Sequence, residues 1–197
     1  MGITSKQLAD MQQRLTNGTE KASALKNYKG SQIILGVDPS LRGTGYGVIN
    51  TSKSIPTTLA QGTIKCPSSW SMSRCFLEIS NQLEAVIGET SPTVAAIEGI
   101  FFAQNIKTAL IMGQARGAAL TAITKAGLDS FEIAPRKVKQ AIVGFGGAQK
   151  EAVAKMVQTR LSLTTTPSPD AADALAIALA FSQSLGSPIP DKAIKPL

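Results

Sequence analysis

The spacing of apolar residues predicts three strands at the start of the folded part of the chain. Strand-length apolar runs, separated by connections that are rich in glycine or contain proline, occupy residues 32–38, 44–51 and 57–66. Because no helical pattern separates these three runs, we expect them to form an antiparallel meander.

Helical periodicity begins after the third strand. Over residues 69–88, apolar side chains recur at the spacing of one helix face: Met72, Phe76, Ile79, Leu83 and Val86 or Ile87. Further along, the pattern predicts strands at 93–99 and 129–134 and helices at 106–127, 135–144, 148–161 and 168–185. This order of elements predicts an α/β fold, in which a mixed five-stranded sheet is flanked by helices.

Two weakly patterned segments lie on either side of this region. With 197 residues, the chain has room for one domain with a sizeable core, and we assign that domain to residues 31–185. Residues 1–30 are interpreted as an N-terminal extension, either a flexible arm or an arm that binds DNA or a partner. The proline-rich residues 186–197 are interpreted as a C-terminal tail.

Composition restricts the chemistry that the chain can perform. It contains no histidine, which excludes Ser-His and Cys-His catalysis and histidine-ligated zinc. Its two cysteines, Cys66 and Cys75, have neither zinc-ligand spacing nor the pattern of a disulfide framework. The N-terminus lacks the apolar core of a secretory signal, and no apolar stretch is long enough to span a bilayer. We therefore expect a soluble protein of the reducing cytoplasm, without a membrane partner.

Positive charge is concentrated in one part of the chain. The formal net charge is +7, and residues 104–160 carry nine basic and three acidic side chains, whereas residues 1–103 carry nine and seven. Such a concentration is typical of a surface that meets a polyanion. A basic protein that is merely soluble would show the same balance, so charge alone leaves both interpretations open.

Four carboxylates stand where a structural role is hard to supply. Asp38 and Glu98 each end a buried strand, and Asp170 and Asp173 project from nearly the same face of the last helix. Taken singly, three of them have local explanations. Asp38 could form a turn with Pro39 and Glu98 could lie at a surface strand end. Asp170 could interact with the positive end of the helix dipole.

The four acids make most sense as a group. Glu98 and Asp173 lie among apolar residues, where a carboxylate needs a partner, and several acids in one cluster would repel one another without a cation. Oxygen ligands favour magnesium or manganese. Carboxylates that hold two such cations about 3.5 to 4 Å apart are suited to the attack of water on a phosphodiester. The group therefore predicts a metal-dependent nuclease.

Five stretches of the chain resemble, in order and spacing, the motifs of a known family. They read "ILGVDPSLRGTGYGVI", "AIEGIFFAQN", "GQARGAA", "APRKVKQAIVG" and "DAADALAIA". The family is the crossover junction endodeoxyribonuclease RuvC, which has a ribonuclease H-like fold, and the resemblance covers about residues 31–181. It implies a homodimer that resolves four-way DNA (Holliday) junctions by paired, symmetric, metal-dependent nicks. It also implies Mg²⁺, two ions per active site with Mn²⁺ as a substitute, and a branch-migration helicase as a candidate partner.

The resemblance also assigns roles to individual residues. The catalytic and metal-binding acids would be Asp38, Glu98, Asp170 and Asp173. Phe101 matches an aromatic residue that stacks on bases near the crossover, and Lys139 and Lys150 match lysines that contact DNA. Arg136 and Lys107 are further basic candidates for DNA contact. From the residues alone, Phe101 could instead be ordinary core, and the lysines could simply be solvated on helices.

Some positions depart from the family pattern, and other functions stay open. Ser40 and Leu41 stand where the family usually has Gly-Ser, and Gln104 stands where it often has lysine. One alternative is a junction- or nucleic-acid-binding module that does not cut, and another is a related nuclease that acts on structured RNA. An actin-like ATPase would need a second, duplicated domain, for which this chain has no room. An organellar or phage setting also stays open.

Overall fold

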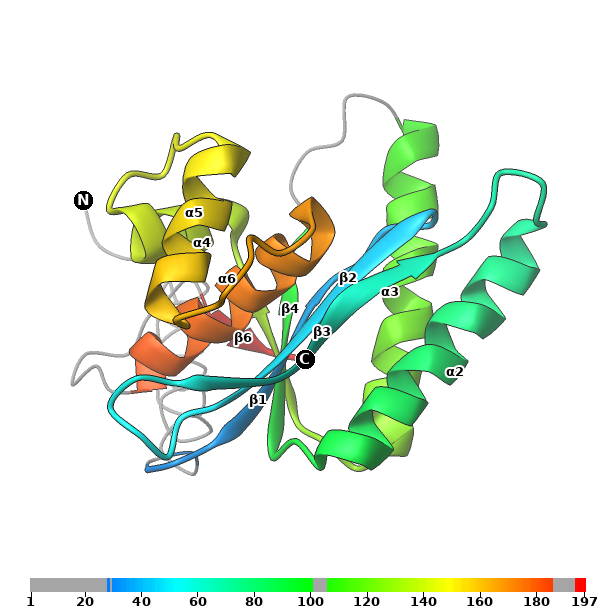
Figure 1. The fold of residues 1–197 in the computed structure, drawn as a ribbon. Helices are drawn as coiled ribbons and strands as arrows, with labels where there is room; N and C mark the ends of the chain where they lie inside the picture. Colours follow the sequence, from blue (N-terminus) through cyan, green and yellow to red (C-terminus); the bar gives the residue numbers. More distant parts are fainter. Residues whose placement is uncertain (1–27, 29, 101–105, 186–193) are drawn as a thin grey trace, which may run out of the picture.

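The protein folds around one central sheet with helices on both faces (Figure 1). The computed structural model describes residues 28, 30–100, 106–185 and 194–197. Its strands are β1 (Ile33–Asp38), β2 (Gly43–Asn50), β3 (Thr57–Lys65), β4 (Val94–Glu98), β5 (Ser130–Ile133) and β6 (Ile194–Pro196). Its helices are α2 (Met72–Thr90), α3 (Ile106–Lys125), α4 (Pro135–Val143), α5 (Lys150–Arg160) and α6 (Pro169–Leu185).

The strand order in the sheet is β3-β2-β1-β4-β5-β6. β1, β2 and β3 pair antiparallel, as the meander predicted, with Asp38 opposite Gly45 and Gly43 opposite Lys65. β4 pairs parallel to β1, and β5 pairs parallel to β4. The mixed α/β architecture inferred from the sequence is confirmed, with each predicted element in its expected place.

The number of strands differs from the prediction. Ile194–Pro196, which the sequence placed in a C-terminal tail, forms β6 and pairs antiparallel with β5. The sheet in the described residues therefore has six strands and not five. A three-residue strand has no readable periodicity, and its formation depends on the free edge of β5. The side chain of Ile194 is 2% exposed and joins the core beside α6.

One face of the sheet is covered by α2 and α3. The buried positions of α2 are Cys75, Ile79, Leu83, Val86 and Ile87. Met72, which the periodicity placed on this apolar face, is 36% exposed because it is the first residue of the helix. The Ser71 side chain accepts a hydrogen bond from the backbone N–H of Arg74 and so caps this helix.

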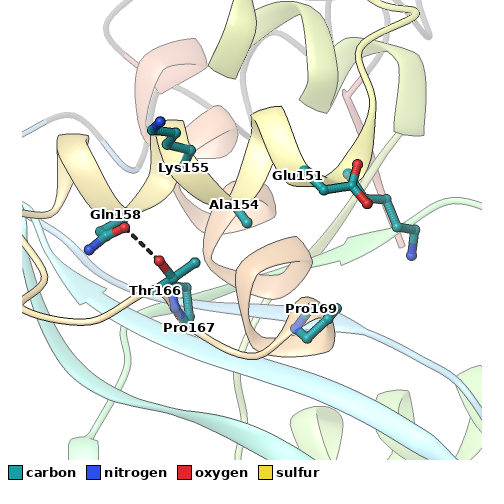
Figure 2. Close-up of a pocket in the computed structure, with 8 residues that line it drawn as sticks. Glu151, Ala154, Lys155, Gln158, Thr166, Pro167 and Pro169 are labelled. Carbon is teal, nitrogen blue, oxygen red and sulfur yellow. Dashed lines mark hydrogen bonds between the residues drawn. The ribbon is translucent and has the colours of Figure 1, made fainter.

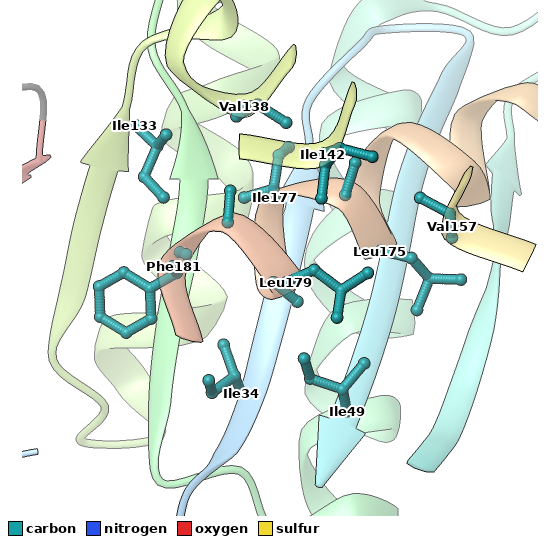
Figure 3. Packing of buried hydrophobic residues seen from close by; sticks show 14 of the residues in the cluster. Ile34, Ile49, Ile133, Val138, Ile142, Val157, Leu175, Ile177, Leu179 and Phe181 are labelled. Atoms are coloured by element: carbon teal, nitrogen blue, oxygen red, sulfur yellow. The ribbon is translucent and has the colours of Figure 1, made fainter. Parts of the chain in front are cut away.

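The other face is covered by α4, α5 and α6. Figure 3 shows the apolar side chains of α6, among them Leu175 and Phe181, above Ile34 of β1 and Ile49 of β2. Burial of each such side chain contributes about 1.5 to 3 kcal/mol, which fixes α6 across the middle of the sheet. No helix in the described ranges is both long and apolar enough to cross a membrane.

α6 lies unusually close to the sheet. A Cβ atom added to Gly45 would lie 2.0 Å from the carbonyl oxygen of Asp170, and one added to Gly36 would lie 2.1 Å from that of Ala174. The backbone of α6 therefore rests directly on β1 and β2, where only glycine leaves room. This contact sets the position of the N-terminal turn of α6, which carries Asp170 and Asp173.

Candidate active site

The sheet topology brings Asp38 and Glu98 together. β1 and β4 are parallel neighbours, and Val37 lies opposite Ile97 in their register. The next residue of each strand, Asp38 or Glu98, therefore lies at the same carboxyl-end edge of the sheet. Ligand and catalytic sites of α/β folds characteristically form at this edge.

The N-terminal turn of α6 supplies the other two acids. Asp170 and Asp173 are three residues apart on this helix, so they share a face. The Asp170 carboxylate lies beside the first residue of β2, because a Cβ atom added to Gly43 would lie 3.0 Å from its Oδ2. The charges of Asp170 and Asp173 both act on Asp38. The structure thus gathers the four acids that the sequence predicted, although their catalytic role stays a prediction.

Asp38 and Glu98 share a proton. Burial raises the pKa of Glu98 from its ordinary 4.5 to about 8, and the charge of Asp38 and a hydrogen bond to Asp38 add to this rise. Burial also raises the pKa of Asp38, together with the charge of Asp173. Near neutral pH, the protonated Glu98 carboxyl therefore donates a hydrogen bond to the Asp38 carboxylate.

Lys150 provides the positive charge of this cluster. It is the first residue of α5, and its Nζ donates a hydrogen bond of 2.9 Å to Oδ2 of Asp173. This bond raises the pKa of Lys150, and the charges of Asp173, Asp38 and Glu98 contribute further. The Lys150 side chain is 67% exposed, so the pair is screened by water and contributes little to stability. The sequence predicted Lys150 as a DNA contact, whereas the structure places it on a candidate catalytic acid.

The donor set fits a divalent cation. Within the described ranges, no three side chains of His, Cys, Asp or Glu are arranged as a ready-made metal site. Burial raises the pKa values of Asp38 and Glu98, with a further contribution from the negative charges of neighbouring acids, and a nearby cation would favour their charged forms. Carboxylate oxygens are the ligands that Mg²⁺ and Mn²⁺ prefer. A cation would bind these acids in competition with the proton that Glu98 holds.

The loop between β1 and β2 is held in place beside Asp38. The buried hydroxyl of Thr44 donates a hydrogen bond of 2.6 Å to the Ser40 carbonyl and accepts one of 3.2 Å from the Ser40 N–H. Arg42 donates hydrogen bonds to the carbonyls of Pro67 and Trp70. The departure from the family pattern at Ser40 and Leu41 is therefore accommodated in an ordered turn.

A partly buried ion pair lies beside the end of β4. Arg116 of α3 donates a hydrogen bond of 2.6 Å to Glu132 of β5, and only 8% of the Arg116 side chain is exposed. The Glu132 side chain lies against Gly99, which follows Glu98 directly. Sequence reasoning missed this pair, since the residues are 16 positions apart and neither position is periodic. The only signal was an arginine within a run of small residues.

A pocket of about 540 Å³ adjoins the acid cluster. It lies between α5 and the segment that leads into α6 (Figure 2). Lys150 lines it, and so does Pro169, the neighbour of Asp170. At one wall the Thr166 hydroxyl donates a hydrogen bond of 2.7 Å to Gln158. Its volume falls within the range of ligand pockets, and sequence reasoning did not predict it.

The remaining predicted DNA contacts lie on helix surfaces or outside the described residues. Arg136 and Lys107 are exposed, on α4 and α3 respectively, and Lys139 is partly exposed on α4. Among the described residues, no hydrogen bond or ion pair joins these three to the acids. Phe101 and Gln104 lie outside the described residues.

Comparison with known proteins agrees with the fold. The family profile for "Crossover junction endodeoxyribonuclease RuvC" matches residues 34–181. The curated RuvC of Heliobacterium modesticaldum is 43% identical over 154 residues, or 78% of this chain and 95% of that protein. A structure of Thermus thermophilus RuvC in complex with a Holliday junction substrate matches with a TM-score of 0.74 at 32% identity, over 84% of this chain and 99% of that one. The yeast mitochondrial Holliday junction resolvase, at 10% identity and a TM-score of 0.57 over 83% of this chain and 85% of that one, shares the fold. This chain therefore belongs to the crossover junction endodeoxyribonuclease RuvC family.

Proposed function

We propose that this protein is an endonuclease that resolves four-way DNA junctions by paired, metal-dependent hydrolysis of phosphodiester bonds. The observation that carries the proposal is the meeting of four acids from β1, β4 and α6 in a member of this family. Two of these acids have raised pKa values because of burial and the negative charge of their neighbours. Strongly perturbed pKa values are typical of functional sites, and a cation-dependent reaction would account for this cluster.

The proposed catalytic residues are Asp38, Glu98, Asp170 and Asp173, and together they would hold Mg²⁺, two ions per site, with Mn²⁺ as a substitute. Held by these residues, such ions would lower the pKa of an attacking water and would stabilise the leaving oxygen. Asp38 and Glu98, each partly buried at its strand end, would line one side of the reacting phosphate. Lys150, held on Asp173, would attract the phosphodiester to the acids, which would otherwise repel it.

DNA binding is proposed to follow the basic stretch. Lys139, Arg136 and Lys107 would contact phosphates, and Phe101 would stack on bases near the crossover. Phosphate contacts position the DNA without reading its sequence. We expect their contribution to weaken steeply with salt, because phosphate neutralisation releases counterions.

We propose that the active form is a homodimer, because symmetric nicks need two active sites. The support lies at the start of α3, where Ile106 is 80% and Leu110 is 62% exposed. A Cβ atom added to Gly117 would meet nothing within 4 Å, and one added to Gly113 would meet only the Ile100 side chain, at 3.8 Å, so another helix could approach closely. Apolar patches of this kind often mark interfaces. A branch-migration helicase as partner and a place in the cytoplasm are proposals that rest on the family alone.

The test is nicking of a labelled four-way junction, with linear duplex and RNA junctions beside it, in magnesium and in chelator. We expect symmetric nicks in magnesium, and we expect Asp38→Asn to lower their rate at least ~100-fold, the size of losing one key electrostatic group. Glu89→Gln, which alters an exposed acid at the far end of α2, is the control and should cut normally. Tight junction binding without cutting, in magnesium and also in manganese, would support a binding module instead. Preferential cutting of RNA junctions would support an RNA nuclease.

A further inference from the structure

An exposed aromatic ring lies in the connection between α4 and α5. Phe145 is 69% exposed, and every other aromatic side chain in the described ranges is buried or only partly exposed. Single exposed apolar residues are common on protein surfaces, so exposure alone assigns no role. What distinguishes Phe145 is how the loop holds it and what surrounds it.

The loop is built to hold the ring in place. Gly144 ends α4 with φ +83°, and its N–H donates a hydrogen bond of 2.9 Å to the Gln140 carbonyl. The Ala148 N–H donates one of 3.2 Å to the Phe145 carbonyl, and Ala148 is buried in the core. A Cβ atom on Gly147 would lie 2.9 Å from the ring of Phe145, so the ring rests against the bare backbone. Phe145 is therefore anchored on both sides.

Basic residues flank this ring in the sequence, and one of them, Arg136, lies against the residue next to it. Between residues 135 and 160 the chain has six basic residues and one acidic residue. The stem of Arg136 lies against Gly146, the neighbour of Phe145, because a Cβ atom there would meet its Cγ at 2.7 Å. Five residues after Phe145, Lys150 reaches Asp173 in the acid cluster. The connection that carries Phe145 thus leads within five residues to the lysine that contacts the candidate active site. Figure 1 shows this connection between α4 and α5 on the upper side of the molecule.

We propose that Phe145 stacks on an exposed base of the DNA strand that enters the active site, while Arg136 contacts a neighbouring phosphate. The inference rests on the proposed function and adds a stacking residue to it. An aromatic ring bordered by cations matches single-stranded nucleic acid, which offers base faces and phosphates in alternation. A purely apolar protein partner would gain nothing from the surrounding positive charge. At a four-way junction, bases beside the crossover are those whose faces can become accessible.

The test measures binding to a four-way junction in chelator, with 2-aminopurine placed in turn at each position beside the crossover. We expect Phe145→Ala to weaken junction binding roughly 5- to 150-fold, the range that loss of one base–aromatic stack implies, and to lower the quenching of one 2-aminopurine position. Phe145→Trp should keep both properties. Leu77→Ala, which removes a side chain that is 61% exposed on α2, is the matched control and should bind normally. The thermal midpoint of Phe145→Ala should stay near that of the wild type.

Several outcomes would overturn the inference. Wild-type affinity and quenching in Phe145→Ala, together with normal junction cutting by the wild type, would remove Phe145 from DNA binding and leave the proposed function standing. Full retention by Phe145→Leu would show that apolar contact, not ring stacking, is needed. A change in sedimentation from dimer to monomer in Phe145→Ala would make the ring a subunit contact. Failure of the wild type to bind or cut any junction would defeat the proposed function itself.

Discussion

The proton shared by Asp38 and Glu98 makes the stability of the metal-free protein depend on pH. The pKa of Glu98 lies near its ordinary 4.5 in the unfolded chain and at about 8 in the folded protein. Between these two values the folded state binds more protons than the unfolded state, so the free energy of unfolding falls as pH rises. At about 1.4 kcal/mol per pKa unit, the whole rise in the pKa of Glu98 corresponds to a decrease on the order of 5 kcal/mol in the free energy of unfolding.

The perturbation is Glu98→Gln, which keeps the size and hydrogen-bonding capacity of the side chain and removes its charge. We expect urea unfolding in chelator to show the wild type losing about 3 to 5 kcal/mol between about pH 5 and pH 9. The variant should show a much flatter profile and should be the more stable protein at about pH 8, although it should not cut junctions. Glu89→Gln, at an exposed position, should keep the slope of the wild type.

Magnesium provides an independent check of the same reasoning. A cation that binds the deprotonated acids should raise the thermal midpoint of the wild type more at about pH 8 than at about pH 6, since at the lower pH it must displace the proton of Glu98. The reasoning is refuted if wild type and Glu98→Gln show parallel stability profiles across this pH range in chelator. That result would mean that Glu98 ionises in the folded state as easily as in water.

Two further predictions concern the framework of the site. Arg116→Met should lower the free energy of unfolding by about 3 to 5 kcal/mol, because it leaves the Glu132 charge without its partner. Urea denaturation measures this loss. Recovery of stability in a variant that also carries Glu132→Leu would attribute the loss to the pair. Gly45→Ala should cost more than about 2 kcal/mol and slow nicking, because the added methyl group would push against the Asp170 carbonyl. The control is Gly88→Ala, where nothing crowds the added atom, and this change should raise the free energy of unfolding by up to about 1 kcal/mol through helix propensity. Equal stability of the two variants would contradict the close contact at Gly45.

Much of the fold could be read from local patterns. Strand-length apolar runs and helical spacing located the elements. Each pattern reflects the face of a strand or helix that is buried against the core. The acids could be identified for a similar reason. Asp38 and Glu98 interrupt the apolar pattern where a strand ends, and Asp173 interrupts it within a helix that is otherwise almost entirely apolar. A carboxylate in such a position indicates a functional role because burial without a partner is costly.

Other features depended on contacts between segments that are distant in sequence. β6 forms only because β5 offers a free edge, and a three-residue strand has no pattern of its own. The resemblance to the family predicted Lys150 as a DNA contact, and its position on Asp173 follows from the packing of α5 against α6. The raised pKa of Glu98 requires the parallel pairing of β4 with β1 as well as burial.

The sequence by itself therefore determined which residues are the candidates for the chemistry and which elements hold them, because side-chain type and periodicity are local properties. Only the tertiary structure decided how the charges interact. The proton between Asp38 and Glu98 and the partly buried pair of Arg116 with Glu132 depend on distance and burial. Both quantities are fixed by the way in which strands and helices pack.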